Sequence, residues 1–184
     1  MNHFIKEFRY SGFSFSEATE PSELNSAIGS LAINFSVLED ELSSAVICLL
    51  GTEIEEGLAV TSEMSFKSKL NVFSSLMKKK LEFGGYAYSP SDFRDLLAMC
   101  AKSEGFRNRL LHSAWVHDHA KKEIRRRKLS AKLSKGFRHD EEPLTPGQVL
   151  DIADYIIYTA VSLEEFIMNC FPEFKRPLES IVYA

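Results

Sequence analysis

The sequence predicts an all-α fold, an up-and-down four-helix bundle with a basic hairpin or loop between the third and fourth helices. Apolar residues recur at three- and four-residue steps over four long segments. With 45% hydrophobic and 26% charged residues, the composition matches soluble globular proteins, and 184 residues suffice for about one domain. We therefore expect an N-terminal arm at residues 1–21 and a helical domain at residues 22–184, with a basic insertion at about 116–142.

The first two helices are predicted from their apolar spacing and their stop signals. The first follows Pro21, carries apolar residues at helical steps from Leu24 to Leu49, and stops at Gly51. The second is expected to begin after Thr61 or Ser62. It continues through three successive lysines, which favour the negative end of a helix dipole, and is expected to end at Gly84 and Gly85.

The third and fourth helices have clearer starts. The third begins around Ser89 to Asp92, and its apolar pattern runs on to Ala114 and Trp115. The fourth opens at Thr145-Pro146-Gly147-Gln148, which provides an N-cap, a proline at the first helical position and a capping-box glutamine. It continues to Cys170 and stops before Pro172. Between these helices, Trp115–Lys121 and Lys128–Leu133 could pair as a two-stranded ribbon, or the segment is a loop.

The charge is distributed unevenly along the chain. The net charge is −4, but residues 121–138 hold nine basic residues and one acid, Glu123. A local concentration of cations is typical of contact with a phosphate backbone, whereas a solvated basic loop is the alternative interpretation. The candidate nucleic-acid-binding residues are Lys121, Lys122, Arg125, Arg126, Arg127 and Lys128.

The cysteines and the N-terminal residues indicate the cellular compartment in which the protein is expected. Cys48, Cys100 and Cys170 are odd in number and lie in apolar helical patterns, which favours reduced core thiols over disulfides or a zinc site. The start MNHFIKEFRYSGF has charges where a secretory signal needs apolar residues, and no uncharged stretch approaches a membrane span. We expect a cytoplasmic protein without a membrane segment.

The third helix carries polar residues on its apolar side. With residues about 100° apart, Glu104, Arg107 and Asn108 fall within the arc that should face the core. Glu104 and Arg107 can pair, while Glu104, Asn108 and His112 follow one another at four-residue steps. Unpaired buried charges are costly. The arc is therefore either an internal polar network or the lining of a cleft or a symmetric partner surface. Arg109 lies far from this arc and is expected at the surface.

The run Arg107-Asn108-Arg109-Leu110-Leu111-His112 resembles the signature of the HEPN superfamily, an arginine and a polar residue followed by three variable residues and a histidine. Members of this family are helical bundles that often act as RNases. The match at residue level is confined to 104–115, and the bundle resemblance covers about 22–171. The resemblance implies a homodimer in which two copies of the motif share one cleft.

The resemblance also implies the chemistry. Metal-independent RNA cleavage, with no cofactor, needs a base at the 2′-hydroxyl and a cation at the phosphate. We assign His112 as general base or acid, Arg107 as phosphate clamp, Asn108 as a positioning group and Glu104 as the residue that orients Arg107. The family further implies a toxin or phage-defence role and a possible antitoxin partner. Some family toxins carry a tyrosine two residues after the histidine, and this chain has Ala114 there.

Other functions remain open from the sequence. A non-catalytic HEPN-like dimer could bind RNA or act as an assembly scaffold, and an ordinary four-helix protein could contain the motif by chance. His112, His117, Asp118 and His119 could be imagined as metal ligands, but no fourth ligand stands at metal-site spacing and we expect no metal. The two later histidines could instead add to the basic surface.

Overall fold

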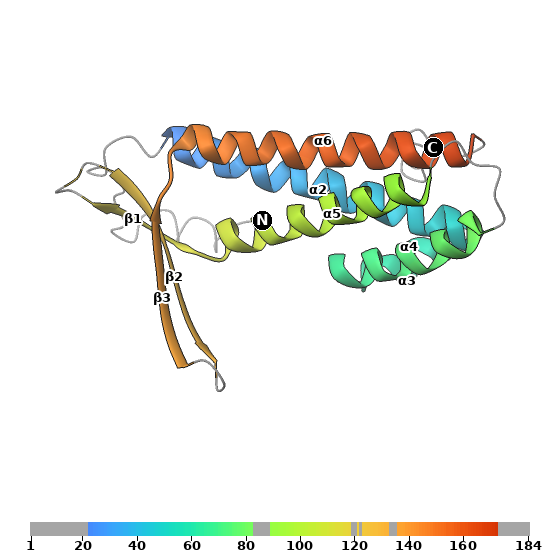
Figure 1. Ribbon diagram of the computed structural model, residues 1–184, viewed down its shortest axis with the longest axis horizontal. Coiled ribbons are helices and arrows are strands. Elements are labelled where there is room, and N and C mark those ends of the chain that lie inside the picture. The colour runs from blue at the N-terminus through green and yellow to red at the C-terminus, as the bar shows by residue number, and fades with distance from the viewer. Residues whose placement is uncertain (1–21, 83–88, 119–120, 122, 133–135, 173–184) are drawn as a thin grey trace, which may run out of the picture.

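The computed structural model describes residues 22–82, 89–118, 121, 123–132 and 136–172, which form five helices and one small sheet (Figure 1). The elements in chain order are α2 (Ser22–Leu50), α3 (Ile54–Ser62), α4 (Phe66–Leu81), α5 (Pro90–Leu111), β1 (Ala114–Asp118), β2 (Glu123–Lys132), β3 (Gly136–Pro143) and α6 (Pro146–Cys170). The mostly helical fold is as the sequence predicts. The N-terminal arm expected at residues 1–21 lies outside the described residues.

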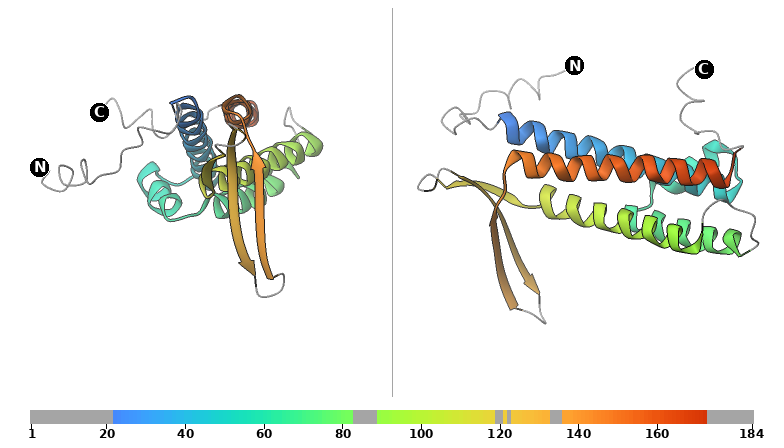
Figure 2. Two further views of the ribbon diagram at one scale, coloured as in Figure 1. Left: turned by 90° about the vertical axis from the view of Figure 1, so that its left-hand side faces the viewer. Right: turned by 45° about the horizontal axis from the view of Figure 1, so that its top comes forward.

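The two longest helices, α2 and α6, lie side by side and run in the same direction (Figures 1 and 2). Asn34 on α2 donates a hydrogen bond to the carbonyl oxygen of Ala153 on α6 at 2.9 Å. Nearer their beginnings, Ser26 and Leu150 line one open pocket between the two helices. Their facing apolar side chains make up much of the core, including Leu31, Leu38, Leu42, Val149, Ile156 and Leu163.

The remaining long helices pack under this pair. On α4, the ring of Phe66 lies tilted against that of Phe35 of α2 with centroids 4.9 Å apart, and Lys69 pairs with Glu39 at 3.1 Å, so α4 follows the direction of α2. On α5, Phe93 lies 5.6 Å from Phe166, near the end of α6. Because the beginning of α5 meets the end of α6, α5 runs against the other three.

The directions in which the long helices run differ from the up-and-down arrangement expected from the sequence. The difference arises from the short helix α3. The short helix α3 occupies the return path after α2, so α4 runs parallel to α2 instead of against it. Ser65, whose side chain accepts from the backbone N–H of Ser68 at 3.2 Å, is the N-cap of α4 in place of Thr61 or Ser62. The expected stop at Gly84 and Gly85 lies outside the described residues.

The ends of the other helices agree with the sequence signals. Gly51 has a φ of 65°, the left-handed conformation that ends α2. Ser89 with Asp92 on α5, and Thr145 with Gln148 on α6, form complete capping boxes in which each side chain bonds the other residue's backbone N–H. These bonds satisfy amides that the first helical turn leaves free.

The predicted basic insertion is a three-stranded antiparallel sheet. The strand order is β1-β2-β3, with Ala114 opposite Arg127, and Arg126 opposite Glu142. The hairpin of β2 and β3 projects from one end of the helices, away from α2 and α6 (Figures 1 and 2). The sheet extends well beyond the two-stranded ribbon considered from the sequence.

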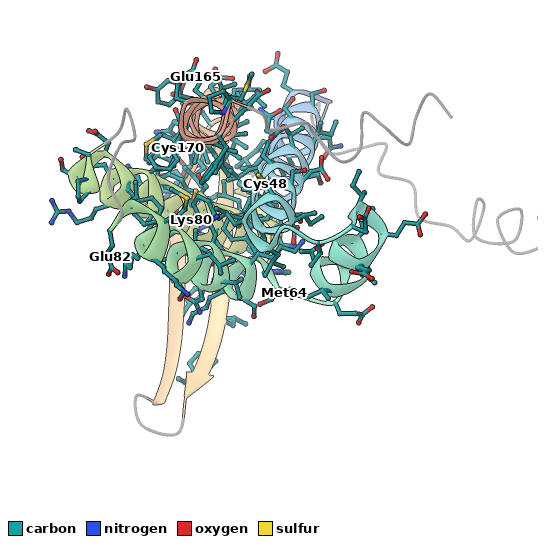
Figure 3. The ribbon with its side chains drawn as sticks, turned by 90° about the vertical axis from the view of Figure 1, so that its right-hand side faces the viewer. Cys48, Met64, Lys80, Glu82, Glu165 and Cys170 are labelled. Atoms are coloured by element: carbon teal, nitrogen blue, oxygen red, sulfur yellow. The ribbon has the colours of Figure 1, made fainter. Side chains whose placement is uncertain are left out.

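The three cysteines are free, and two of them are buried. Figure 3 views the helices from the end away from the sheet, where Cys48 and Cys170 are labelled on α2 and α6. Burial raises the pKa of the Cys100 thiol to about 12, so this thiol stays protonated at neutral pH. Within the part of the chain that the structure describes, no helix has the length and apolar character to cross a membrane.

Substitution of Gly57 should destabilise the protein, because the close approach of α3 to α2 leaves no room for a side chain. A Cβ at this position would lie 2.7 Å from both Cγ1 and Cγ2 of Ile47, a β-branched residue that cannot easily turn away. Gly57→Ala should lower the free energy of unfolding by roughly 1–2 kcal/mol, since overpacking outweighs the gain in helix propensity.

Gly29→Ala is the matched control, because nothing lies within 4 Å of its added Cβ. It should raise the free energy of unfolding by about 0.5–1 kcal/mol. Urea denaturation measures both changes. Equal effects of the two substitutions would contradict the packing of α3 described above.

Candidate functional site

Helix α5 ends immediately before the last residue of the predicted motif. His112 is the C-cap, with φ −101° and ψ 24°, and the helix stops at Leu111. The Ser113 hydroxyl donates to the carbonyl oxygen of Arg109, and Trp115 Nε1 donates to that of Leu110 at 3.3 Å. These two side chains satisfy carbonyls that the end of a helix leaves free.

The helix does not extend through Ala114 and Trp115, so the prediction from the apolar pattern is wrong at this end. Both residues belong to β1, which pairs with β2. The apolar phase of the helix persists to Trp115 because Trp115 packs against the same core from a strand. The position of His112 at a helix end leaves its side chain exposed.

Three residues predicted as catalytic come together at this end of α5. Arg107 Nη1 donates to Asn108 Oδ1 at 2.9 Å and lies 3.2 Å from His112 Nε2. An arginine side chain has only donors, so His112 Nε2 is the acceptor in this contact and carries a lone pair. The arrangement therefore places an imidazole nitrogen beside the guanidinium of Arg107.

The guanidinium of Arg107 is held against the core. Its Cζ lies 5.3 Å from the centroid of the buried Phe35 ring on α2, a favourable cation–π distance. Arg107 Nε is buried and has no hydrogen-bond partner among the described residues. An unsatisfied buried donor costs free energy, and a catalytic role is one explanation for such a group in a folded protein. Arg107 and Asn108 are half-buried while His112 is exposed, so the cluster is not sealed inside the subunit.

Glu104 does not bond to Arg107 in the described part of the structure, although it was expected to orient that side chain. It is half-buried, and within the described residues it makes no hydrogen bond or ion pair with Arg107. Asn108 and His112 hold the guanidinium instead. The role of Glu104 as a supporting residue stays a prediction.

The basic residues of β2 are largely paired with acids. Arg125 bonds Glu141 at 2.7 Å and also Glu123, and Arg127 bonds Glu141 at 3.2 Å. Lys121 is exposed, Lys128 is half-buried near Asp140, and Lys122 lies outside the described residues. The described part of β2 therefore presents fewer unpaired cations than its number of basic residues suggests.

Arg126 forms the centre of an ionic network that the sequence analysis did not find. Its side chain is 1% exposed; Nε donates to Glu142 Oε1 at 2.6 Å, Nη1 to Ser113 Oγ at 3.0 Å, and Nη2 to Asp140. Glu142 also accepts from Arg109 Nε and Nη2, at 3.0 and 2.6 Å. This network joins β2 and β3 to the last turn of α5, next to His112. The acidic run 140–142 following the basic run was the available sequence signal.

The network lowers the pKa values of its carboxyl groups. For Asp140, hydrogen bonding and the charge of Arg126 lower the pKa. For Glu142, burial raises the pKa, but hydrogen bonds from Arg126 and Arg109 outweigh burial, and the pKa lies below its ordinary value. Burial likewise opposes ionisation of Glu141, and Arg127 and Arg125 lower its pKa overall.

The alternative metal site finds no support in what can be described. His119 lies outside the described residues, as does the side chain of His117, and Asp118 accepts from the backbone N–H of Lys121 at 3.2 Å. Among described residues, no three His, Cys, Asp or Glu side chains gather in a way that could hold a metal ion.

Comparisons with known proteins give no match to a family model, to a curated protein or to a solved structure.

Removing the Arg126 side chain should leave its carboxylate partners without their shared cation. Arg126→Met should lower the free energy of unfolding by about 2–3 kcal/mol, below the full cost of breaking a buried pair because Glu142 and Asp140 can rehydrate. Arg127→Met, at a partly exposed ion pair, should cost less than about 1 kcal/mol. Denaturant titration at pH 7 compares them, and equal losses would show that Arg126 is not the centre of the network.

The same carboxylates should make stability depend on acid. Their folded pKa values lie below the ordinary values of 3.8 for Asp140 and 4.5 for Glu142, so their contribution is complete above those values. This contribution to stability is lost as the pH falls through the pKa values of the folded state, starting at about pH 5. The Tm of the wild type should therefore fall more steeply below pH 5 than that of Arg126→Met. Parallel curves from pH 7 to 3 would contradict the assigned pairing.

Proposed function

We propose that this protein is a metal-independent endoribonuclease of HEPN type, acting in the cytoplasm, whose long helices form the bundle that supports the motif. The observation that carries the proposal is the cluster of Arg107, Asn108 and His112, with Nη1 of Arg107 in contact with both other side chains. A cation, a positioning amide and an imidazole are the groups that phosphodiester cleavage needs.

In the proposed reaction, His112 acts on the proton of the ribose 2′-hydroxyl. The hydroxyl oxygen attacks the adjacent phosphorus, the bond to the 5′-oxygen breaks, and the products are a 2′,3′-cyclic phosphate and a 5′-hydroxyl. Arg107 holds the phosphate as negative charge builds on it, which a planar guanidinium does through two hydrogen bonds.

The contact between Arg107 and His112 fits a resting state of this site. While Nη1 donates to Nε2, the lone pair of His112 is occupied. A phosphate that draws the guanidinium to itself releases Nε2, so binding of substrate and activation of the base would occur together. The same Nη1 also donates to Asn108 Oδ1, which holds the guanidinium in place.

One motif supplies one imidazole, whereas the reaction needs a base and an acid to protonate the leaving 5′-oxygen. We propose that a second copy provides the other His112 across a twofold axis. The exposure of His112 at the end of α5 leaves it accessible to such a partner. The RNA would lie across both motifs, with Lys128 on β2 beyond Arg127, the residue that pairs with Ala114.

The second candidate is a non-catalytic HEPN-like dimer that serves as an RNA-binding module or scaffold. The pairing of Arg125, Arg126 and Arg127 with acids of β3 favours the scaffold role over RNA binding, because paired cations release fewer counterions from RNA and bind it less. In that case the cluster around Arg107 would be an interface network.

Cleavage of a labelled RNA in EDTA tests the proposal. His112→Ala should lower the rate by at least about 10²-fold, because it removes the proton-transfer group. Arg107→Lys should also lower it strongly, since an ammonium cannot hold phosphate at two points. Arg94→Lys, at an exposed position in the first half of α5, is the matched control and should leave the rate unchanged.

The products should carry the cyclic phosphate. Undiminished cutting by folded, purified His112→Ala would exclude the assignment. RNA binding by the wild type without any cleavage would favour the non-catalytic candidate.

A further inference from the structure

The outer part of the β2–β3 hairpin, residues 128–132 and 136–140, extends beyond the rest of the sheet; we call it the ribbon. β1 pairs only with residues 123–127 of β2, so within the described sheet the ribbon's two strands pair only with each other. The ribbon points away from the helices in both views (Figures 1 and 2).

The ribbon exposes large apolar side chains. Leu129 is 60% exposed and Phe137 is 71% exposed. Leu129 pairs with His139 and Ala131 with Phe137, so Leu129 and Phe137 are diagonal neighbours on one face of the hairpin. The ribbon also contains three basic residues, Lys128, Lys132 and Arg138, and one acid, Asp140. The ribbon is thus apolar and cationic.

The outer side of the α2–α6 pair is apolar and flanked by acids, and so complements the ribbon. Ser26 and Leu150 line one pocket there. Ile33 and Val37 lie within about 20° of Ser26 around α2, and Val161 and Met168 within about 20° of Leu150 around α6. Their side chains are exposed, Ile33 at 66% and Met168 at 52%. We call this surface the α2–α6 face; it consists of Ile33, Val37, Leu150, Val161 and Met168.

The two helices that carry this face have only negative charges. Together α2 and α6 hold eight acidic residues and no basic residue. Glu23, Asp151, Asp154 and Glu165 are exposed, and Figure 3 shows Glu165 on the outward side of α6, away from α4 and α5. Apolar side chains flanked by acids suit a partner that is apolar and cationic.

A single chain cannot bring these surfaces together. The network around Arg126 fixes the root of the hairpin to the end of α5, and the hairpin leads away from the side of the molecule that α2 and α6 occupy (Figure 1). In a pair of chains related by a twofold axis, each copy can offer one ribbon and receive one.

We propose that the ribbon of one copy docks on the α2–α6 face of a second copy, with Leu129 and Phe137 packed against Val161 and Met168 and the ribbon's cations beside the acids of α2 and α6. The surfaces are distinct from the Arg107–His112 cluster. The inference therefore goes beyond the proposed nuclease activity and does not depend on it.

Two double variants separate the surfaces. The ribbon variant is Leu129→Thr with Phe137→Thr, which keeps strand propensity, and the face variant is Val161→Gln with Met168→Gln, which keeps helix propensity. All four positions are exposed, so the fold should persist. Val60→Gln, at an exposed apolar residue of α3, is the matched control.

Sedimentation velocity of the full chain should show a dimer for the wild type and for Val60→Gln. Each double variant alone should dissociate at least about tenfold more readily, because it loses two buried apolar contacts at both junctions. An equimolar mixture of the two variants should recover association, since a face-variant ribbon can still dock on a ribbon-variant face.

Three results would overturn the proposal. A monomeric wild type would leave the face to another occupant, such as residues 1–21. Double variants that dimerise as the wild type does would place the dimer contact elsewhere. A mixture no more associated than its components would show that ribbon and face do not meet.

Discussion

The buried guanidinium of Arg126 is the constraint on which the arrangement of this protein depends. A charge that is 1% exposed must be matched by partners, and its three partners come from two parts of the chain: Ser113 after α5, and Asp140 and Glu142 on β3. Glu142 also binds Arg109 in the last turn of α5. The sheet is thereby rooted at the end of that helix.

This attachment determines where the candidate site lies. Ser113 receives a hydrogen bond from Arg126 and itself caps α5, so the chain leaves the helix immediately after the motif. His112 consequently occupies the C-cap, exposed and within reach of Arg107. From the other side, Phe35 of α2 supports the guanidinium of Arg107. The helical core thus positions Arg107, and the ionic network around Arg126 positions His112, so that the two side chains meet.

Local signals were enough to predict α2 and α6. Their apolar periods are long, and the glycine at 51 and the capping box at 145–148 mark boundaries within a residue or two. The motif cluster was also accessible, because residues 107, 108 and 112 lie within two turns of one helix. In contrast, α3 was missed since only Gly57 and Thr61 are buried along its nine residues, and neither is an apolar marker.

The remaining features depend on contacts between distant residues. The strands were only partly predicted because β2 and β3 are held by charge pairs, which produce no apolar alternation. The end of α5 was misplaced because Trp115 continues the helical phase while lying in a strand. Glu104 was expected to orient Arg107 from its three-residue spacing, but the side chain that holds the guanidinium from within the helix is that of Asn108.

The most direct test of the proposed site is a crystal structure with a short RNA whose 2′-hydroxyl next to the scissile phosphate is methylated, so that it binds but cannot react. The account predicts a phosphate within hydrogen-bond distance of the Arg107 guanidinium, with His112 of one copy facing the blocked oxygen. RNA bound on another surface, with Arg107 still donating to His112, would contradict it.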